Sequence, residues 1–321
     1  PPKQYISQLE DRQAVDTLFL LKDKNLGVGK NSKPWLGLLL ADKSGVLDGR
    51  IWEKADQINK LLNTGDIVRV KGQIQFFQNR KQLVIHKIDV ESNDQIDMNL
   101  FVQQSSFDAK DMYAELSAIV KKLKDEHIKQ LLFSTLEDPE IKERLLKSPA
   151  AKSIHHAWFG GLLEHILSIC HIMEFMAKHY KFLNFDLLIF GAIYHDIGKI
   201  WELNIDHGIQ YTDRGRLLGH LMMSVELIEK KASRILGFPD DLKDICKHIV
   251  LSHHGTLEYG SPKRPKFLEA VVVNMVDNLD SRVATLHQFL EEERHTGEKW
   301  SKYNQMFDRY FLLTRFDNET L

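Results

Sequence analysis

The spacing of hydrophobic residues divides the chain into a first part that predicts strands and a longer part that predicts helices. Up to about residue 95, runs rich in β-branched residues, aromatic residues and leucine cover 15–21, 35–41, 46–52, 67–77 and 82–90, with polar and glycine-containing turns between them. Residues 96–111 are polar and weakly patterned, which predicts a linker. From about residue 112 almost to the end, apolar residues recur every three or four positions, as in amphipathic helices. We therefore expect a multidomain α and β protein.

The strand-forming part has the order of a known small barrel. Residues 54–63 have the spacing of a short helix, and they lie between the third and fourth predicted strands. Five strands with a helix after the third is the order of an OB-type β-barrel. The sequence thus predicts an OB-type domain over 1–95, a linker over 96–111 and an all-α helical bundle over 112–321.

Composition limits the partners that the protein can have. The 321 residues are 43% hydrophobic and 27% charged, which is typical of a globular protein in water. No apolar run approaches the roughly 20 residues of a membrane span, so no membrane partner is expected. Both cysteines lie in apolar helical patterns, which predicts a reducing, cytoplasmic compartment. Because the formal net charge is -2, any surface that binds nucleic acid must be local.

Aromatic and cationic residues gather where an OB barrel binds its ligand. Such a barrel uses its second and third strands with the flanking loops. Aromatic rings stack on bases and cations follow phosphates, as single-stranded nucleic acids require. The candidates for this contact are Lys33, Trp35, Arg50, Trp52 and Arg80. The alternative, that the tryptophans only fill the barrel core, stays open at this point.

The helical part repeatedly places histidines and aspartates beside apolar runs. Burying a carboxylate is costly unless it is paired or coordinates a metal. Imidazole and carboxylate ligands suit manganese, iron or zinc, and seven candidates exceed what one tetrahedral ion uses. They are enough for two divalent ions with Asp196 bridging them, although each histidine taken alone can equally be an ordinary core residue. The candidates are His165, His195, Asp196, His220, His253, His254 and Asp277.

The order of these residues resembles the HD phosphohydrolase superfamily, and the extra histidines resemble its dinuclear branch. More narrowly, the chain is similar to the YhaM family of bacterial 3′-to-5′ exoribonucleases, which combine an OB domain with an HD domain. The resemblance rests on the following segments, in order: HHAWFGGLLEH (155–165), HDIGK (195–199), GH (219–220), SHHG (252–255), LEYGSP (257–262) and NMVDNLD (274–280).

The resemblance implies a role for each site residue. It implies one metal held by His165, His195, Asp196 and Asp277, and a second metal held by His220, His253 and His254 with Asp196 shared. Manganese is the first expectation for both metals, with iron or zinc as alternatives. Asp196 and Lys199 would be catalytic, Lys199 by neutralising charge on a phosphate. His156 and Arg214 are further candidates for substrate contact.

The expected activity is hydrolysis of single-stranded RNA from its 3′ end to 5′-mononucleotides, with single-stranded DNA as a further substrate class. Two alternatives stay open. One is an HD phosphohydrolase of small nucleotides or cyclic dinucleotides; Gly-Ser-Pro at 260–262, where cyclic-di-GMP phosphodiesterases of the superfamily carry Gly-Tyr-Pro, argues against the cyclic substrates. The other is a single-stranded nucleic-acid-binding protein with an inactive HD fold. The sequence also leaves a homo-oligomer open.

Overall fold

The computed structural model describes residues 3–29, 33–77, 80–91, 96–101, 107–151, 158–204, 209–294 and 297–314. Its backbone contacts group the chain into two compact units, residues 96–281 and residues 1–95 together with 282–321. The sequence assigned all of 112–321 to the helical domain, so the last forty residues group differently from that expectation. Within the first unit, Glu293, near the end of the last helix, accepts a hydrogen bond of 2.7 Å from Arg80 on the barrel.

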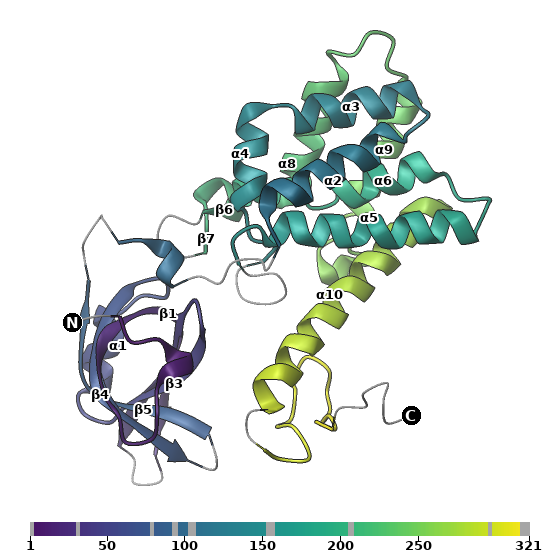
Figure 1. Ribbon diagram of the computed structural model, residues 1–321. Helices are drawn as coiled ribbons and strands as arrows, with labels where there is room; N and C mark the ends of the chain where they lie inside the picture. The colour runs from purple at the N-terminus through teal and green to yellow at the C-terminus, as the bar shows by residue number, and fades with distance from the viewer. Residues whose placement is uncertain are drawn as a thin grey trace. The chain divides into compact units, whose positions relative to one another are not determined.

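The first unit contains the expected five-stranded barrel (Figure 1). Its strands close in the order β1-β2-β3-β5-β4, with β3 and β5 parallel and the other pairs antiparallel. A short helix, α1, follows the third strand, so the OB-type prediction is confirmed. A 3-10 turn, η1 (Ile6–Gln8), precedes the barrel. The elements are β1 (Ala14–Val28), β2 (Pro34–Asp42), β3 (Gly45–Ile51), α1 (Ala55–Leu61), β4 (Ile67–Phe77) and β5 (Arg80–Val90).

Alternation along β2 shows how the barrel sorts its side chains. Leu36, Leu38 and Leu40 are fully buried and fill the interior. Because successive side chains of a strand point to opposite faces, Trp35 lies on the outside. Trp52, just after β3, is 59% exposed. The alternative that these two tryptophans fill the barrel core is therefore wrong.

The second unit is helical, as expected, apart from one small hairpin (Figure 1). The short strands β6 (Leu203–Asn204) and β7 (Gln210–Tyr211) form that hairpin, and η2 (Met98–Leu100) and η3 (Leu257–Tyr259) are single 3-10 turns. No helix in the described part of the chain is long and apolar enough to cross a membrane. The helices are α2 (Ala109–Lys121), α3 (Glu126–Leu136), α4 (Pro139–Lys147), α5 (Gly161–His179), α6 (Phe185–Tyr194), α7 (Lys199–Glu202), α8 (Asp213–Ala232), α9 (Asp240–Ser252) and the first half of α10 (Leu268–Arg294).

The centre of the helical unit is formed by α5 and α6. Eight of the ten residues of α6 are buried, and α5 buries a broad apolar face that includes Ile166, Ile169 and Cys170. Helices this apolar must be surrounded by other helices, so their side chains define the interior of the domain. A polar residue on their buried faces, such as His165, is consequently held in a dry setting.

The chain after α10 departs from the expected helical pattern. Over residues 297–314 the structure has no helix, only isolated bridges such as that between Trp300 and Leu312. Aromatic residues here have roughly helical spacing, but Phe289 and Phe307 each pack a ring on Phe311 instead. Contacts with neighbouring elements have overridden the local periodicity.

Candidate metal centre

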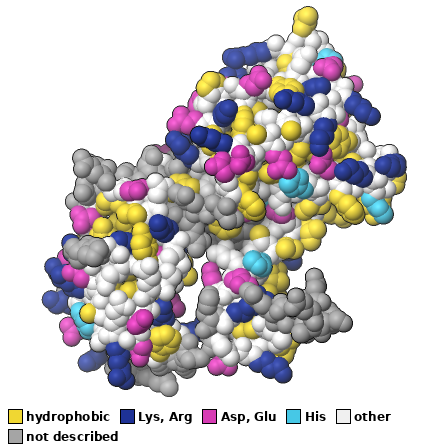
Figure 2. All heavy atoms as spheres, in the orientation of Figure 1, with side chains coloured by type: hydrophobic (Ala, Val, Ile, Leu, Met, Phe, Trp, Pro, Cys, Tyr) yellow, Lys and Arg dark blue, Asp and Glu magenta, His cyan; other side chains and the backbone are white. Residues whose placement is uncertain are grey.

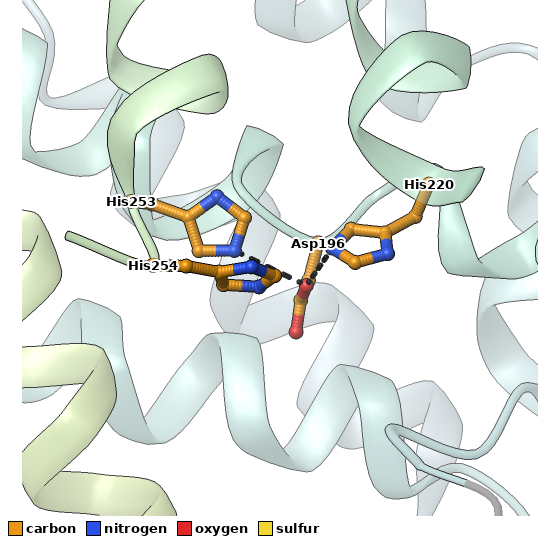
Figure 3. A group of neighbouring side chains, drawn as sticks. All are labelled: Asp196, His220, His253 and His254. Atoms are coloured by element: carbon orange, nitrogen blue, oxygen red, sulfur yellow. Dashed lines mark ion pairs between the residues drawn. The ribbon is translucent and has the colours of Figure 1, made fainter. Parts of the chain in front are cut away.

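Two clusters of potential metal ligands lie in the helical unit, and together they contain all seven candidates from the sequence. One cluster is His165, His195 and Asp277, and the other is Asp196, His220, His253 and His254. Within each cluster the donor atoms lie within 4.8 Å of one another. Figure 3 shows the side chains of the second cluster pointing toward one another, with His253 and His254 adjacent on one segment and Asp196 and His220 on two others. The fold thus gathers residues that are up to 112 positions apart in the sequence.

The first cluster has the spacing of ligands around one ion. His165 Nε2 lies 3.2 Å from His195 Nε2 and 3.3 Å from Asp277 Oδ1. Donors that share an ion at about 2.1 Å are about 3.0–3.4 Å apart, depending on whether the geometry is octahedral or tetrahedral. Two of the three separations fall in that range, and the third, 3.8 Å between His195 Nε2 and Asp277 Oδ1, is slightly longer. The three donor atoms thus lie at nearly the spacing of ligands to one divalent metal.

Asp196 connects the two clusters through its two carboxylate oxygens. Oδ2 lies 3.4 Å from His195 Nε2, in the first cluster. Oδ1 lies 3.4 Å from His220 Nε2 and 3.7 Å from His253 Nε2, in the second (Figure 3). One oxygen facing each cluster is the arrangement that a carboxylate bridging two ions requires.

Unsatisfied polar atoms provide an independent test of the fit. Four buried atoms have no hydrogen-bond partner among the described residues, and all belong to the second cluster: Asp196 Oδ1, His220 Nε2, His253 Nε2 and His254 Nδ1. Leaving one such group unsatisfied costs about 1–3 kcal/mol, and native proteins contain few of them. Their concentration at one point is explained if they bind a cation.

Local backbone features bring His220 and the histidine pair into place. Gly219 interrupts α8 with φ +70° and ψ 162°, a conformation that side chains other than glycine disfavour. The kink turns the next residue, His220, toward Glu202, which accepts from its backbone N–H at 3.0 Å. Gly255 has φ +83° and lies against Asn274, whose Nδ2 donates to the carbonyl of His253 at 2.6 Å. The end of α9 is therefore fastened to α10.

The second nitrogen of each buried histidine is also fixed. His195 Nδ1 and His253 Nδ1 lie 3.0 Å and 2.8 Å from backbone carbonyls, those of Ala192 and Val250. Because Nδ1 donates to the carbonyl, Nε2 is left as the lone-pair donor that faces the cluster.

Two carboxylates play the corresponding part for His165 and His220, and neither was a candidate ligand or catalytic residue from the sequence. Asp280 Oδ2 lies 2.8 Å from His165 Nδ1, and Glu202 Oε1 lies 3.1 Å from His220 Nδ1. Asp280 has a weak sequence signal, because it follows Asp277 by three positions on the same face of α10. Glu202 has none, since only the fold brings it to His220.

Electrostatics keep the shared carboxylate charged. Burial alone would raise the pKa of Asp196, but the charge of Lys199, together with interactions with His195 and His220, outweighs burial and holds that pKa well below its usual range. Lys199 Nζ lies 2.7 Å from Asp196 Oδ2, and its side chain is 14% exposed. Burial lowers the pKa of Lys199, but Asp196 more than compensates and raises it. The ammonium group is thus a charged and nearly buried neighbour of the site, not a solvated helix end.

Of the two remaining sequence candidates for substrate contact, the structure describes only Arg214, which makes its ion pair elsewhere. Arg214 is half exposed and forms an ion pair with Glu226. His156 lies outside the described residues, so its expected role stays a prediction.

On the barrel, three of the candidates form one surface. The guanidinium of Arg50 lies 4.7 Å from the ring centre of Trp35, and the rings of Trp35 and Trp52 are 6.3 Å apart. The Trp35 ring covers Gly27 and Gly37, where any Cβ atom would come within 3 Å of it. Trp35, Arg50 and Trp52 thus present a joined aromatic and cationic surface, which we call the barrel platform.

The other two barrel candidates are Arg80 and Lys33. Arg80 is paired with Glu293 at 2.7 Å, which uses an N–H at one edge of its guanidinium. Lys33 is exposed beside the start of β2.

Comparison with known protein families assigns both parts of the chain. Residues 21–91 match the model of an OB-fold nucleic acid binding domain. Residues 162–282, which contain all seven candidate ligands, match the model of the HD domain. The class that fold and site define is therefore an HD-domain protein with an N-terminal OB-fold domain.

Solved structures resemble the two parts separately. The second OB-fold domain of replication protein A from Methanococcus maripaludis is 17% identical, with a TM-score of 0.24, over 30% of this chain and 100% of that one. The mitochondrial single-stranded DNA binding protein Rim1 from S. cerevisiae is 16% identical, with a TM-score of 0.22, over 26% and 99%. The HD domain of the L. monocytogenes phosphodiesterase PgpH is 22% identical, with a TM-score of 0.31, over 46% and 74%. At these values the substrate has to be inferred from the residues of this chain.

Proposed function

We propose that this protein is a metal-dependent phosphodiesterase that degrades single-stranded RNA from its 3′ end and releases 5′-mononucleotides. The observation that carries the proposal is the pair of ligand clusters sharing Asp196, with the ammonium of Lys199 beside them. Paired metal sites of this kind suit displacement at phosphorus. The OB-fold domain supports a nucleic acid strand as the substrate, because Trp52 of its barrel platform is exposed and Trp35 and Arg50 are partly exposed.

The ligand set fits two divalent transition metals, with manganese as the first candidate and iron or zinc as alternatives. When bound, such ions supply an activated water and neutralise charge on the phosphate oxygens. His165, His195 and Asp277 would hold one ion, His220, His253 and His254 the other, and Asp196 both.

The remaining chemistry is carried by residues of the chain. In the reaction, an oxygen–phosphorus bond forms to water and the bond from phosphorus to the 3′-oxygen of the preceding nucleotide breaks, with a proton passing to that oxygen. Lys199 is placed to stabilise the extra negative charge on the phosphate oxygens. Because it is almost dry and already charged, its interaction is stronger than it would be in water.

The barrel platform would bind the strand by stacking and by charge. Trp35 and Trp52 offer ring faces for bases, and Arg50 offers a cation for phosphate. Both cysteines are buried and unpaired, which agrees with our proposal that the enzyme is cytoplasmic.

The test uses a 5′-labelled single-stranded RNA, incubated with the full chain and Mn²⁺. We expect products that shorten progressively from the 3′ end, together with free 5′-mononucleotides. Asp196→Asn should abolish this shortening of the RNA, while circular dichroism should show that the protein stays folded. If Asp196→Asn with metal bound degraded RNA at the wild-type rate, the proposed chemistry would be wrong.

Parallel substrates separate the rival functions. The rate of degradation of a DNA strand with the same base sequence shows whether the enzyme prefers a substrate with the 2′-hydroxyl. Rapid turnover of free nucleotides or cyclic dinucleotides, with little on the oligonucleotide, would instead indicate a small-nucleotide phosphohydrolase. A protein that binds RNA but neither contains nor recruits a transition metal would indicate a binding protein with an inactive HD fold.

A further inference from the structure

The end of α5 and the turn after it expose a group of aromatic rings that the proposed activity does not use. Phe175 is 66% exposed, Tyr180 is 40% exposed and Phe182 is 72% exposed. His179, between them, is exposed as well. We call these four residues the aromatic ladder. None of them belongs to the ligand clusters.

The rings of the ladder contact one another in series. Phe175 and His179 stack with their ring centres 6.1 Å apart and an angle of 12° between the planes. His179 meets Tyr180 edge to face at 4.5 Å, and Tyr180 is tilted against Phe182 at 5.6 Å. The result is one continuous aromatic surface instead of separate exposed side chains.

The backbone under the ladder is well fastened. The N–H of Tyr180 donates to the carbonyl of Met176 at 2.8 Å, and the N–H of Leu183 donates to the carbonyl of Tyr180 at 3.0 Å. Leu183 is buried, and the N–H of Asn184 donates to Glu269 on α10 at 2.8 Å. The rings are therefore presented by an ordered turn, so a ligand would not have to order it on binding.

Charge indicates what this surface binds. Lys178 and Lys181 are exposed and alternate with the aromatic residues, while the nearby Glu174 is already paired with Lys122 at 2.7 Å. Figure 2 shows basic, histidine and hydrophobic side chains together at this end of α5. Protein interfaces are enriched in aromatic residues but depleted in lysine. Aromatic faces interleaved with lysines are typical of surfaces for single-stranded nucleic acids.

We infer that the aromatic ladder is a second binding surface for single-stranded nucleic acid, carried by the helical unit and separate from the barrel platform. Bases would stack on the rings of Phe175, Tyr180 and Phe182, and the lysines would contact phosphates. The inference goes beyond the proposed function and rests on it only for the kind of polymer that is bound.

The first test measures the affinity of the full chain for a fluorescein-labelled oligouridylate in EDTA, where no cleavage occurs. The double variant Phe175→Ser, Phe182→Ser should bind at least about tenfold more weakly, because stacking contributes about 1–3 kcal/mol per base. The matched control is Leu236→Ser, which removes an apolar side chain that is 99% exposed elsewhere and should change nothing. The double variant Trp35→Ala, Trp52→Ala should keep residual binding. Adding Phe175→Ser and Phe182→Ser to that variant should remove it.

The second test examines the lysines through salt dependence. Replacing Lys178 and Lys181 by glutamine should flatten the plot of log affinity against log salt by about 0.7 for each phosphate that the protein no longer neutralises. Lys230→Gln, an exposed lysine on α8, is the control and should leave the slope unchanged.

The outcomes separate this inference from the proposed function. If wild type binds and degrades RNA and the ladder variants bind equally well, the inference is wrong and the proposed function stands. If the ladder variants change the oligomeric state in light scattering but keep their RNA affinity, the surface is an interface between copies and the inference is likewise wrong. If wild type neither binds nor degrades RNA, both fail. Unchanged thermal unfolding of each variant shows that the fold is intact.

Discussion

Glu202 should control the second metal position without touching a metal. Its carboxylate accepts from the backbone N–H of His220 at 3.0 Å and from Nδ1 of the same residue at 3.1 Å. Burial raises the pKa of Glu202, but its hydrogen bonds with His220 outweigh burial, so the pKa is lowered and the group is charged at neutral pH. A charged acceptor on Nδ1 orients the imidazole and makes Nε2 a stronger donor.

The size of the effect follows from the hydrogen bonds that the substitution removes. Hydrogen bonds to a charged group are worth about 1.5–3 kcal/mol, which corresponds to about 10- to 150-fold in affinity. Loss of an outer partner of a metal-bound histidine typically costs about 10- to 100-fold. We therefore expect Glu202→Ala to weaken one metal by about that amount, and Glu202→Gln, which keeps an acceptor, to weaken it less.

The chain offers a matched comparison at the other cluster. Asp280 supports His165 Nδ1 at 2.8 Å as Glu202 supports His220. Titrating metal-free protein with Mn²⁺ in a calorimeter, together with elemental analysis after dialysis, gives the number and affinity of bound ions. Glu202→Ala should weaken one ion and Asp280→Ala the other. Wild-type binding of both ions by Glu202→Ala, or weakening of the same ion by both variants, would refute the reasoning.

Three further predictions concern the same site. Gly219→Ala should lower the free energy of unfolding by about 1–3 kcal/mol, because φ is +70° there, and should weaken metal binding; chemical denaturation and metal titration measure both. Lys199→Met should reduce kcat on RNA about 100-fold or more while metal remains bound, and a wild-type kcat would contradict its role. In the metal-free protein, burial lowers the pKa of His165 from 6.5, but hydrogen bonds to Asp277 and Asp280 and the charge of Asp196 raise it to about 9. Protonated His165 stabilises the folded state fully below pH 6.5, and this stabilisation is lost as the pH rises through 9, so the urea midpoint of unfolding should fall across that window. A midpoint that stays constant would argue against the raised pKa of His165.

The sequence alone determined the elements and the residue types of the site. Alternation and turn residues in the first 90 positions specify a five-stranded barrel with a helix after its third strand, because a strand exposes every second side chain. Histidines and aspartates set beside apolar runs indicated a metal centre, since buried polar groups need partners. These signals are local in the sequence, so they can be recognised without the tertiary structure.

Only the tertiary structure decided how the pieces meet. Glu202 and His220 are 18 positions apart, and the kink at Gly219 that joins them has no periodic signature. Helical spacing did not reveal that the end of α10 groups with the barrel, where Glu293 pairs with Arg80. Exposed rings such as Phe182 look like core residues in a sequence. Burial, pairing and charge depend on distances between segments, and chain order does not contain those distances.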